Sequence, residues 1–205
     1  MSNIENKAFS FIIGHGRGWA FSPSDLMHIL SRQQIDNILS DLMQKQKIRR
    51  VCRGMYDYPK YSTLLEQELS PDIDQVARAF ARKFNWRIAP SGESALNLLG
   101  LSTQVPGKYV YLSDGPNRSY KIGNTSLEFK KRVLKEIGFK YAQSSLIVQA
   151  LRSLGKENIS TEIIANIQSQ IDEKSCAKIL KDTKGVTDWI YETIKLICHK
   201  EDTDV

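Results

Sequence analysis

Apolar side chains recur at helical spacing in two consecutive segments near the start of the chain. The first follows Ser22-Pro23, a cap and first-turn pair, and has Asp25 at the position where an acid favours the helix dipole. The second follows Ser31, with Gln34 placed to complete a capping box. Its apolar stripe consists of Ile35, Ile38, Leu39, Leu42 and Met43. With a further helix expected over residues 4–14, the pattern predicts a small helical core and a tight turn before Ser31.

The chain then becomes extended and strongly basic. Two short runs on either side of Arg53-Gly54 predict a hairpin. Five cations and no acid lie within residues 45–53, namely Lys45, Lys47, Arg49, Arg50 and Arg53. Two helices followed by a basic hairpin predict a winged helix-turn-helix, in which the polar start of the second helix enters the major groove and the hairpin lies on phosphates.

The remaining pattern predicts a second domain. Residues 59–71 contain Pro59 and Pro71 and are interpreted as a linker. Helices are expected over residues 72–84, 91–99 and, in several segments, 144–198, with an antiparallel meander of strands over 109–112, 118–122 and 125–129. The predicted class is α+β. An N-terminal winged helix-turn-helix occupies residues 1–62, and residues 70–205 form a mixed domain with a small antiparallel sheet and a C-terminal helical bundle.

The amino-acid composition indicates which classes of binding partner to expect. The chain has 205 residues, 41% of them hydrophobic, and a formal net charge of +6, which favours a polyanionic partner. The three cysteines, Cys52, Cys176 and Cys198, are scattered, which favours a reducing compartment without a disulfide framework or zinc site. No membrane-length apolar run and no signal-peptide pattern occur, so we expect a cytoplasmic protein with no membrane association.

Two sets of residues are candidates for DNA contact in the first domain. Base edges would be read by the start of the second helix, Ser31, Arg32, Gln33, Gln34 and Asn37, since Arg suits guanine and Gln and Asn suit adenine. Phosphates would be held by Lys47, Arg49, Arg50 and Arg53. The alternative is that this polar face is only solvated and that the module binds protein.

A second basic block follows in the expected meander. It consists of Arg118, Lys121, Lys130, Lys131 and Arg132. This block is interpreted either as a second DNA-contacting surface or as a solvated sheet edge that discourages aggregation.

The sequence predicts no enzyme. His15, His28 and His199 lack partners at ligand spacing, and Asp114 has no second carboxylate near it with which to hold a metal. We therefore expect no catalytic residues, no metal and no cofactor. An enzyme acting on nucleic acid is kept as a third hypothesis.

Several short sequence segments, taken in order along the chain, resemble the corresponding segments of one protein family. They are GWAFSPSD at 18–25, KIRRVCRGMYDYP at 47–59, PSGESALNLLGLSTQVP at 90–106, YLSDG at 111–115, and QALR at 149–152 with LGK at 154–156. Together they resemble the AbiEi-type antitoxins and transcriptional regulators of bacterial toxin–antitoxin and abortive-infection loci, over roughly residues 9–195.

The resemblance implies a two-domain repressor and antitoxin. The N-terminal winged helix of such a protein binds double-stranded operator DNA, typically inverted repeats, and represses its own operon. The C-terminal domain is associated with neutralising a cognate nucleotidyltransferase-like toxin, directly or indirectly, and in relatives assists DNA binding. The resemblance leaves open the operator, the toxin, the oligomeric state and the task of the C-terminal helices.

Overall fold

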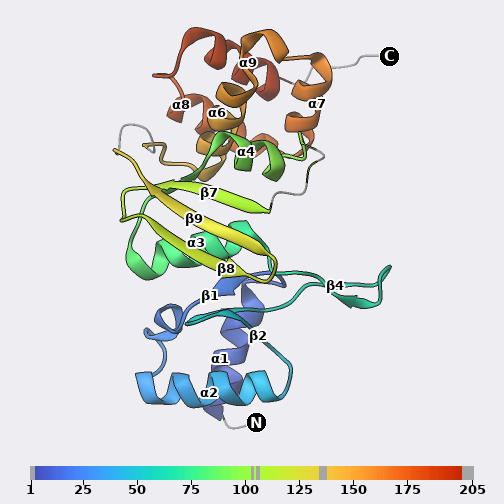
Figure 1. The fold of residues 1–205 in the computed structure, drawn as a ribbon. Helices are drawn as coiled ribbons and strands as arrows, with labels where there is room; N and C mark the ends of the chain where they lie inside the picture. The colour runs from blue at the N-terminus through green and yellow to red at the C-terminus, as the bar shows by residue number, and fades with distance from the viewer. Residues whose placement is uncertain (1–2, 103, 105–106, 134–137, 200–205) are drawn as a thin grey trace. The chain divides into compact units, whose positions relative to one another are not determined.

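The computed structural model describes residues 3–102, 104, 107–133 and 138–199, and it has a mixed α+β architecture (Figure 1). The chain divides into two compact units, residues 1–86 with 119–127 and residues 87–118 with 128–205. This division differs from the boundary expected between residues 62 and 70, because helix α3 (Ile73–Phe84) packs within the first unit. Its Arg82 donates from Nε to a carboxylate oxygen of Asp25 at 2.8 Å and from Nη2 to the carbonyl of Ala20 at 2.7 Å.

The first unit begins with the expected helices around one apolar core. Helix α1 spans Asn3–Gly14 and α2 spans Arg32–Gln44, with Ser31 as the N-cap of α2 and Gln34 closing a capping box. The capping prediction is confirmed. The buried residues of this core include Ala8, Ile12, Phe21, Leu26, Ile35, Leu39 and Leu42.

The helix expected after Ser22 is only a 3-10 turn, η1 (Pro23–Leu26). Asp25 accepts from the backbone N–H of Ser22 at 2.8 Å and closes this first turn. The chain then turns again through residues 27–30 to reach the cap at Ser31, which leaves no room for a longer α-helix. Met27, in this turn, is 57% exposed in consequence.

The hairpin expected around Gly54 is present. Strands β2 (Arg49–Cys52) and β3 (Met55–Asp57) pair antiparallel, with a register shift between Arg50 and Cys52. Gly54 has φ +72°, a left-handed conformation that glycine adopts without steric cost. Strand β1 (Ala20–Phe21) pairs with β3, so the three-stranded sheet has the order β1-β3-β2.

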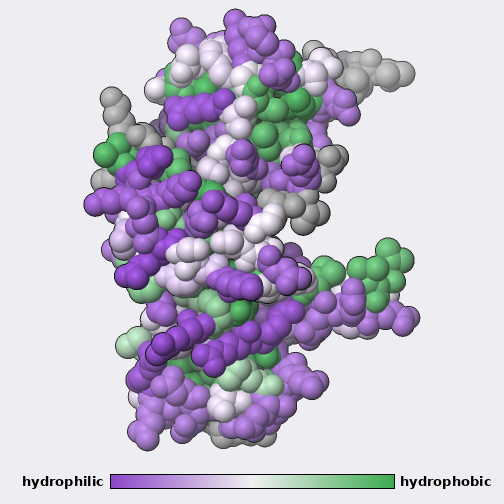
Figure 2. All heavy atoms as spheres, in the orientation of Figure 1, coloured by the Kyte–Doolittle hydropathy of each residue, from purple (hydrophilic) through white to green (hydrophobic). Residues whose placement is uncertain are grey.

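The segment interpreted as a linker contains a second, two-stranded sheet. Strands β4 (Tyr61–Ser62) and β5 (Gln67–Glu68) pair antiparallel and form a projecting arm. Figure 2 shows hydrophobic residues at the tip of this arm, where Leu64 is 90% and Leu65 57% exposed.

The order of strands in the larger sheet differs from the expected meander. Strands β6 (Ile88–Pro90), β7 (Lys108–Ser113), β8 (Arg118–Ile122) and β9 (Thr125–Lys131) have the order β6-β7-β9-β8. Strand β9 therefore lies between β7 and β8, where a meander would place β8. The sheet also includes β6, which pairs antiparallel with β7.

Helices form the rest of the second unit. They are α4 (Gly92–Leu98), α6 (Ala142–Leu154), η2 (Lys156–Asn158), α7 (Thr161–Ser169), α8 (Glu173–Asp182) and α9 (Asp188–Cys198). The side chains of Ser160 and Asp172 cap α7 and α8 by accepting from the backbone N–H groups of Ile163 and Lys174. Helix α6 begins before Ser144, because the Asp182 carboxylate accepts the N–H groups of Lys140 and Tyr141 at its start. Over the described ranges, no helix is both long and apolar enough to span a membrane.

Candidate nucleic-acid interface

The start of α2 presents part of the predicted base-reading set to solvent. Gln33 and Asn37 are exposed, as are Ser31 and Arg32. Arg32 pairs with Asp36 through a 3.2 Å contact on the open surface, and such exposed pairs contribute little to stability. An incoming phosphate or base can therefore displace Asp36 from Arg32 at small cost.

Gln34 has a structural partner that limits its availability. Its side-chain oxygen accepts from the backbone N–H and the hydroxyl of Ser31, both at 3.0 Å. The hydroxyl of Ser31 in turn accepts from the backbone N–H of Gln34 at 3.5 Å. Ser31 and Gln34 thus satisfy donors at the start of α2, which leaves Gln33 and Asn37 as the uncommitted amide side chains of the set.

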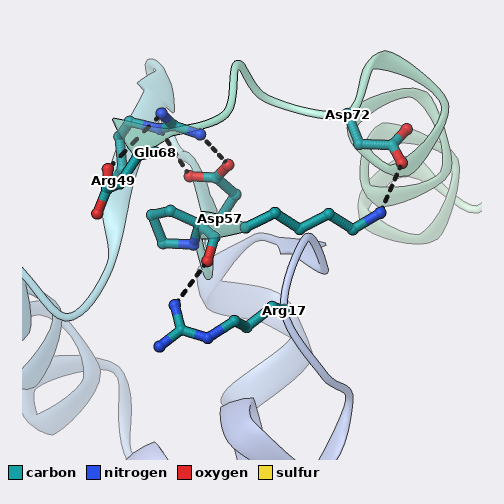
Figure 3. Close-up of polar contacts among 7 residues, drawn as sticks. Arg17, Arg49, Asp57, Glu68 and Asp72 are labelled. Carbon is teal, nitrogen blue, oxygen red and sulfur yellow. Dashed lines mark hydrogen bonds and ion pairs between the residues drawn. The ribbon is translucent and has the colours of Figure 1, made fainter. Parts of the chain in front are cut away.

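Arg49 forms an ion pair with a buried carboxylate in the hairpin. Its Nε and Nη2 donate to the two oxygens of Asp57 at 3.1 and 2.7 Å, a bidentate pair (Figure 3). The Asp57 side chain is only 2% exposed and that of Arg49 30% exposed, while Glu68 lies 3.8 Å from Arg49 Nη1. Burial raises the pKa of Asp57, and the hydrogen bonds and charge of Arg49 oppose that rise.

The other hairpin cations differ from Arg49. Arg50 and Arg53 are exposed and form no ion pair or hydrogen bond with any residue that the structure describes. Lys47 is half-buried and lies over the ring of Phe9, 4.6 Å from its centroid, while Lys45 pairs with the buried Glu5. Of the four predicted phosphate-binding residues, Arg50 and Arg53 are thus the two best placed to reach a phosphate.

One groove of the first unit, with a volume of about 670 Å³, is lined by Arg32 and Asp36 of α2 together with Arg50 and Arg53 of the hairpin. Its walls come from the start of α2, the β2-β3 hairpin, the end of α3 and strand β8. The cations that line it are Arg32, Arg50, Arg53, Lys83 and Lys121, and the aromatic side chains are Tyr56, Phe80, Phe84 and Tyr120. The Asp36 carboxylate opposes these five cations.

The residues of the second basic block lie in two different units of the structure. Lys121 lies in the groove with the hairpin cations. Arg118, Lys130, Lys131 and Arg132 belong to the second unit, where they are exposed. In that unit Asn117 accepts from the backbone N–H of Lys131 at 2.7 Å, and Arg132 donates to the carbonyl of Lys131 at 3.0 Å.

Lys83 is a groove residue that the sequence interpretation missed. It lies in the last turn of α3, a position where a cation is ordinarily explained by the helix dipole. In the local sequence, the pair Arg82-Lys83 was the only indication of a basic site, and the helix over residues 72–84 was expected in the second domain. Only the packing of α3 on the first unit places Lys83 beside the hairpin.

The remaining candidates for chemistry have structural partners. Asp114 accepts from the backbone N–H of Arg87 at 2.8 Å in the turn after β7. Burial, together with the hydrogen bond and the charge interaction between Cys198 and the neighbouring Cys176, raises the pKa of Cys198 to about 12. Within the part of the chain that the structure describes, no three His, Cys, Asp or Glu side chains gather to hold a metal ion.

Comparisons with other proteins place the chain in a family. No curated protein matched the sequence. A solved structure, the crystal structure of the RV2827C protein from Mycobacterium tuberculosis, aligns with 97% of this chain and 77% of that one, at 10% identity and a TM-score of 0.37. The model of the DUF6088 family, described as a family of unknown function, matches residues 8–179. The chain therefore belongs to the DUF6088 family.

Proposed function

We propose that this protein binds double-stranded DNA through a winged helix formed by its first unit, without catalytic activity. The observation that carries the proposal is the shared groove, in which the polar start of α2 lies beside the exposed Arg50 and Arg53 of the hairpin. The order of elements, helix, strand, short helix, helix and hairpin, is compatible with a winged helix. Arg32, Gln33 and Asn37 would read bases, and Arg50 and Arg53 would hold phosphates.

The biological role that we propose is that of a cytoplasmic autorepressor and antitoxin. This part rests on the resemblance to AbiEi-type regulators, which is carried by the ordered series of sequence segments between residues 18 and 156. The operator would be an inverted repeat in front of the protein's own gene. The second unit would act on a cognate nucleotidyltransferase-like toxin, and its exposed Arg118, Lys130, Lys131 and Arg132 would assist DNA binding.

A specific feature also favours a second candidate function, a protein-interaction module that does not bind specific DNA. The β4-β5 arm presents Tyr61, Leu64 and Leu65 to solvent, at 51%, 90% and 57% exposure. Exposed apolar side chains gathered at one site are typical of protein interfaces. Isolated two-stranded hairpins are also marginally stable in water, so a partner would stabilise the arm.

The two functions are separated by binding to DNA at two salt concentrations. The purified protein is titrated against its own upstream fragment and against a scrambled fragment, at about 50 mM and about 200 mM salt. A DNA-binding repressor prefers the upstream fragment and loses affinity steeply with salt. Equal and weak binding to both fragments contradicts the repressor proposal and favours the interaction module.

A further inference from the structure

Lysines from two distant segments line the same groove as the hairpin arginines. Lys83 comes from the end of α3 and Lys121 from β8, which are 30 and 68 residues further along the chain than Arg53. Both segments belong to the first unit.

The position of Lys83 is defined by two observations. A β-carbon built on Gly54, at the turn of the hairpin, would lie 3.0 Å from Lys83 Nζ, so the ammonium group lies against the hairpin turn. Burial raises the pKa of the Cys52 thiol, while the charges of Lys83 and Arg50 lower it, so both cations lie near this thiol of strand β2. Lys83 also lies over the ring of Phe84, with Nζ 5.3 Å from its centroid.

Lys121 also lines the groove, and its neighbour in β8 fixes this strand on α3. Tyr120 stacks on Phe80 of α3, with the ring centroids 3.9 Å apart and the rings inclined by 24°. Lys121 follows directly and is exposed. The stack joins β8 to the helix that carries Lys83.

The groove gathers positive charge without matching negative charge. Arg50, Arg53, Lys83 and Lys121 form no ion pair with any carboxylate among the residues that the structure describes, and Asp36 is paired with Arg32. Like charges that converge on one surface repel and lower the stability of the compact state. A polyanion placed in the groove removes that repulsion and gains contacts with all of these cations.

We propose that Lys83 and Lys121 bind backbone phosphates of the same DNA that Arg50 and Arg53 contact, so that the groove is one continuous phosphate-binding surface. The inference rests on the proposed DNA binding and extends it from the hairpin to α3 and β8. Duplex DNA carries about one negative charge per 1.7 Å of its axis, so a row of cations along a groove fits it. Three of these cations are exposed, namely Arg50, Arg53 and Lys121. An open surface of this kind fits an extended polyanion better than a small phosphate ligand, which would be enclosed.

The test compares the salt dependence of DNA binding in matched charge variants. The double variant Lys83→Gln/Lys121→Gln is compared with the wild type and with Lys7→Gln/Lys184→Gln, which removes two exposed lysines that do not line the groove. The upstream duplex and a scrambled duplex are both titrated. The groove variant should lower the slope of log K against log salt by about 1.8 units, while keeping the preference for the upstream duplex. The control pair should change this slope less than the groove pair does.

The stability of the unbound variants provides a second readout. Because two repelling charges are removed, the groove variant should melt at the same temperature as the wild type or higher, and added salt should raise its melting temperature less. Lys83→Arg/Lys121→Arg keeps both charges and should restore the wild-type slope. A misfolded groove variant would be recognised by its melting curve, and the single variants Lys83→Gln and Lys121→Gln, each expected to lower the slope by about 0.9 units, would then carry the test.

Three outcomes overturn the inference in distinguishable ways. If the groove variant keeps the wild-type slope while Arg50→Ala lowers it, Lys83 and Lys121 do not contact DNA but the proposed function stands. If the wild type binds neither duplex at low salt, both proposals fail. If pyrophosphate or ATP binds the wild type but not the groove variant, and DNA binding is equal in both, the groove is a site for a small phosphate ligand.

Discussion

Replacement of Arg49 by methionine should destabilise the first unit through the carboxylate that it leaves behind. Arg49 makes two charge-assisted hydrogen bonds to Asp57, at 3.1 and 2.7 Å, and the Asp57 side chain is 2% exposed. Removal of one partner of a fully buried ion pair costs about 3–5 kcal/mol. Because Arg49 is itself 30% exposed, part of the attraction is screened, and we expect a loss of about 2–4 kcal/mol in the free energy of unfolding.

The measurement is urea unfolding followed by tryptophan fluorescence. Trp19 is 9% exposed, and its carbonyl accepts from the N–H of Tyr58, next to Asp57, at 3.0 Å, so its emission reports on this region. Arg53→Met is the matched control, since Arg53 is exposed, and it should change the free energy of unfolding by less than about 0.5 kcal/mol.

The pH dependence of the loss tests the electrostatic reasoning. Burial raises the pKa of Asp57 and Arg49 lowers it, so the variant should have a still higher pKa for this carboxyl in the folded state. The cost of an ionised buried carboxylate is present above the folded-state pKa and is relieved as pH falls through it. The gap between wild type and Arg49→Met should therefore shrink as the pH is lowered from neutral towards the range in which carboxyl groups ordinarily titrate. A gap below about 1 kcal/mol that stays constant over this range would refute the reasoning.

Four further predictions concern DNA contact, helix capping and thiol reactivity. Arg50→Ala and Arg53→Ala should each weaken binding to all duplexes and lower the salt slope by about one unit, as measured by titration at several salt concentrations. Asn37→Ala should cost about 1–3 kcal/mol on the preferred site and relax preference at one position in a binding-site selection. Gln34→Ala should instead lower the free energy of unfolding by about 0.5–1 kcal/mol, because it opens the capping box, and a selection profile altered as strongly as by Asn37→Ala would contradict this. Cys198 has a pKa of about 12, so it should be alkylated by iodoacetamide at pH 8 far more slowly than a free thiol, as followed by mass spectrometry.

Several local elements were predictable because their causes lie within a few residues. The Ser31–Gln34 capping box and the hairpin turn at Gly54 both occur where the sequence indicated. A cap joins side chains to backbone groups two or three residues away, and a left-handed turn requires only glycine at one position. Such interactions form in the same way whatever the rest of the chain does.

Elements that depend on distant partners were predicted less well. The apolar run after Pro23 was expected to continue as a helix, but the next cap at Ser31 follows too closely and only η1 forms. The strands after Lys108 were identified, yet β9 lies between β7 and β8. Strand order is decided by which edges pair across the whole sheet, and periodicity along one strand carries no information about it.

The candidate site shows the same division between local and distant causes. The sequence by itself determined that a polar helix start and a basic hairpin occur close together, because residues 31–53 are contiguous and their turn chemistry is local. Only the tertiary structure decided which cations are available. The packing of the hairpin buries Asp57 against Arg49 but leaves Arg50 and Arg53 exposed. The packing of α3 and β8 places Lys83 and Lys121 in the same groove, because the burial of apolar side chains, which acts without regard to sequence separation, determines which distant segments meet.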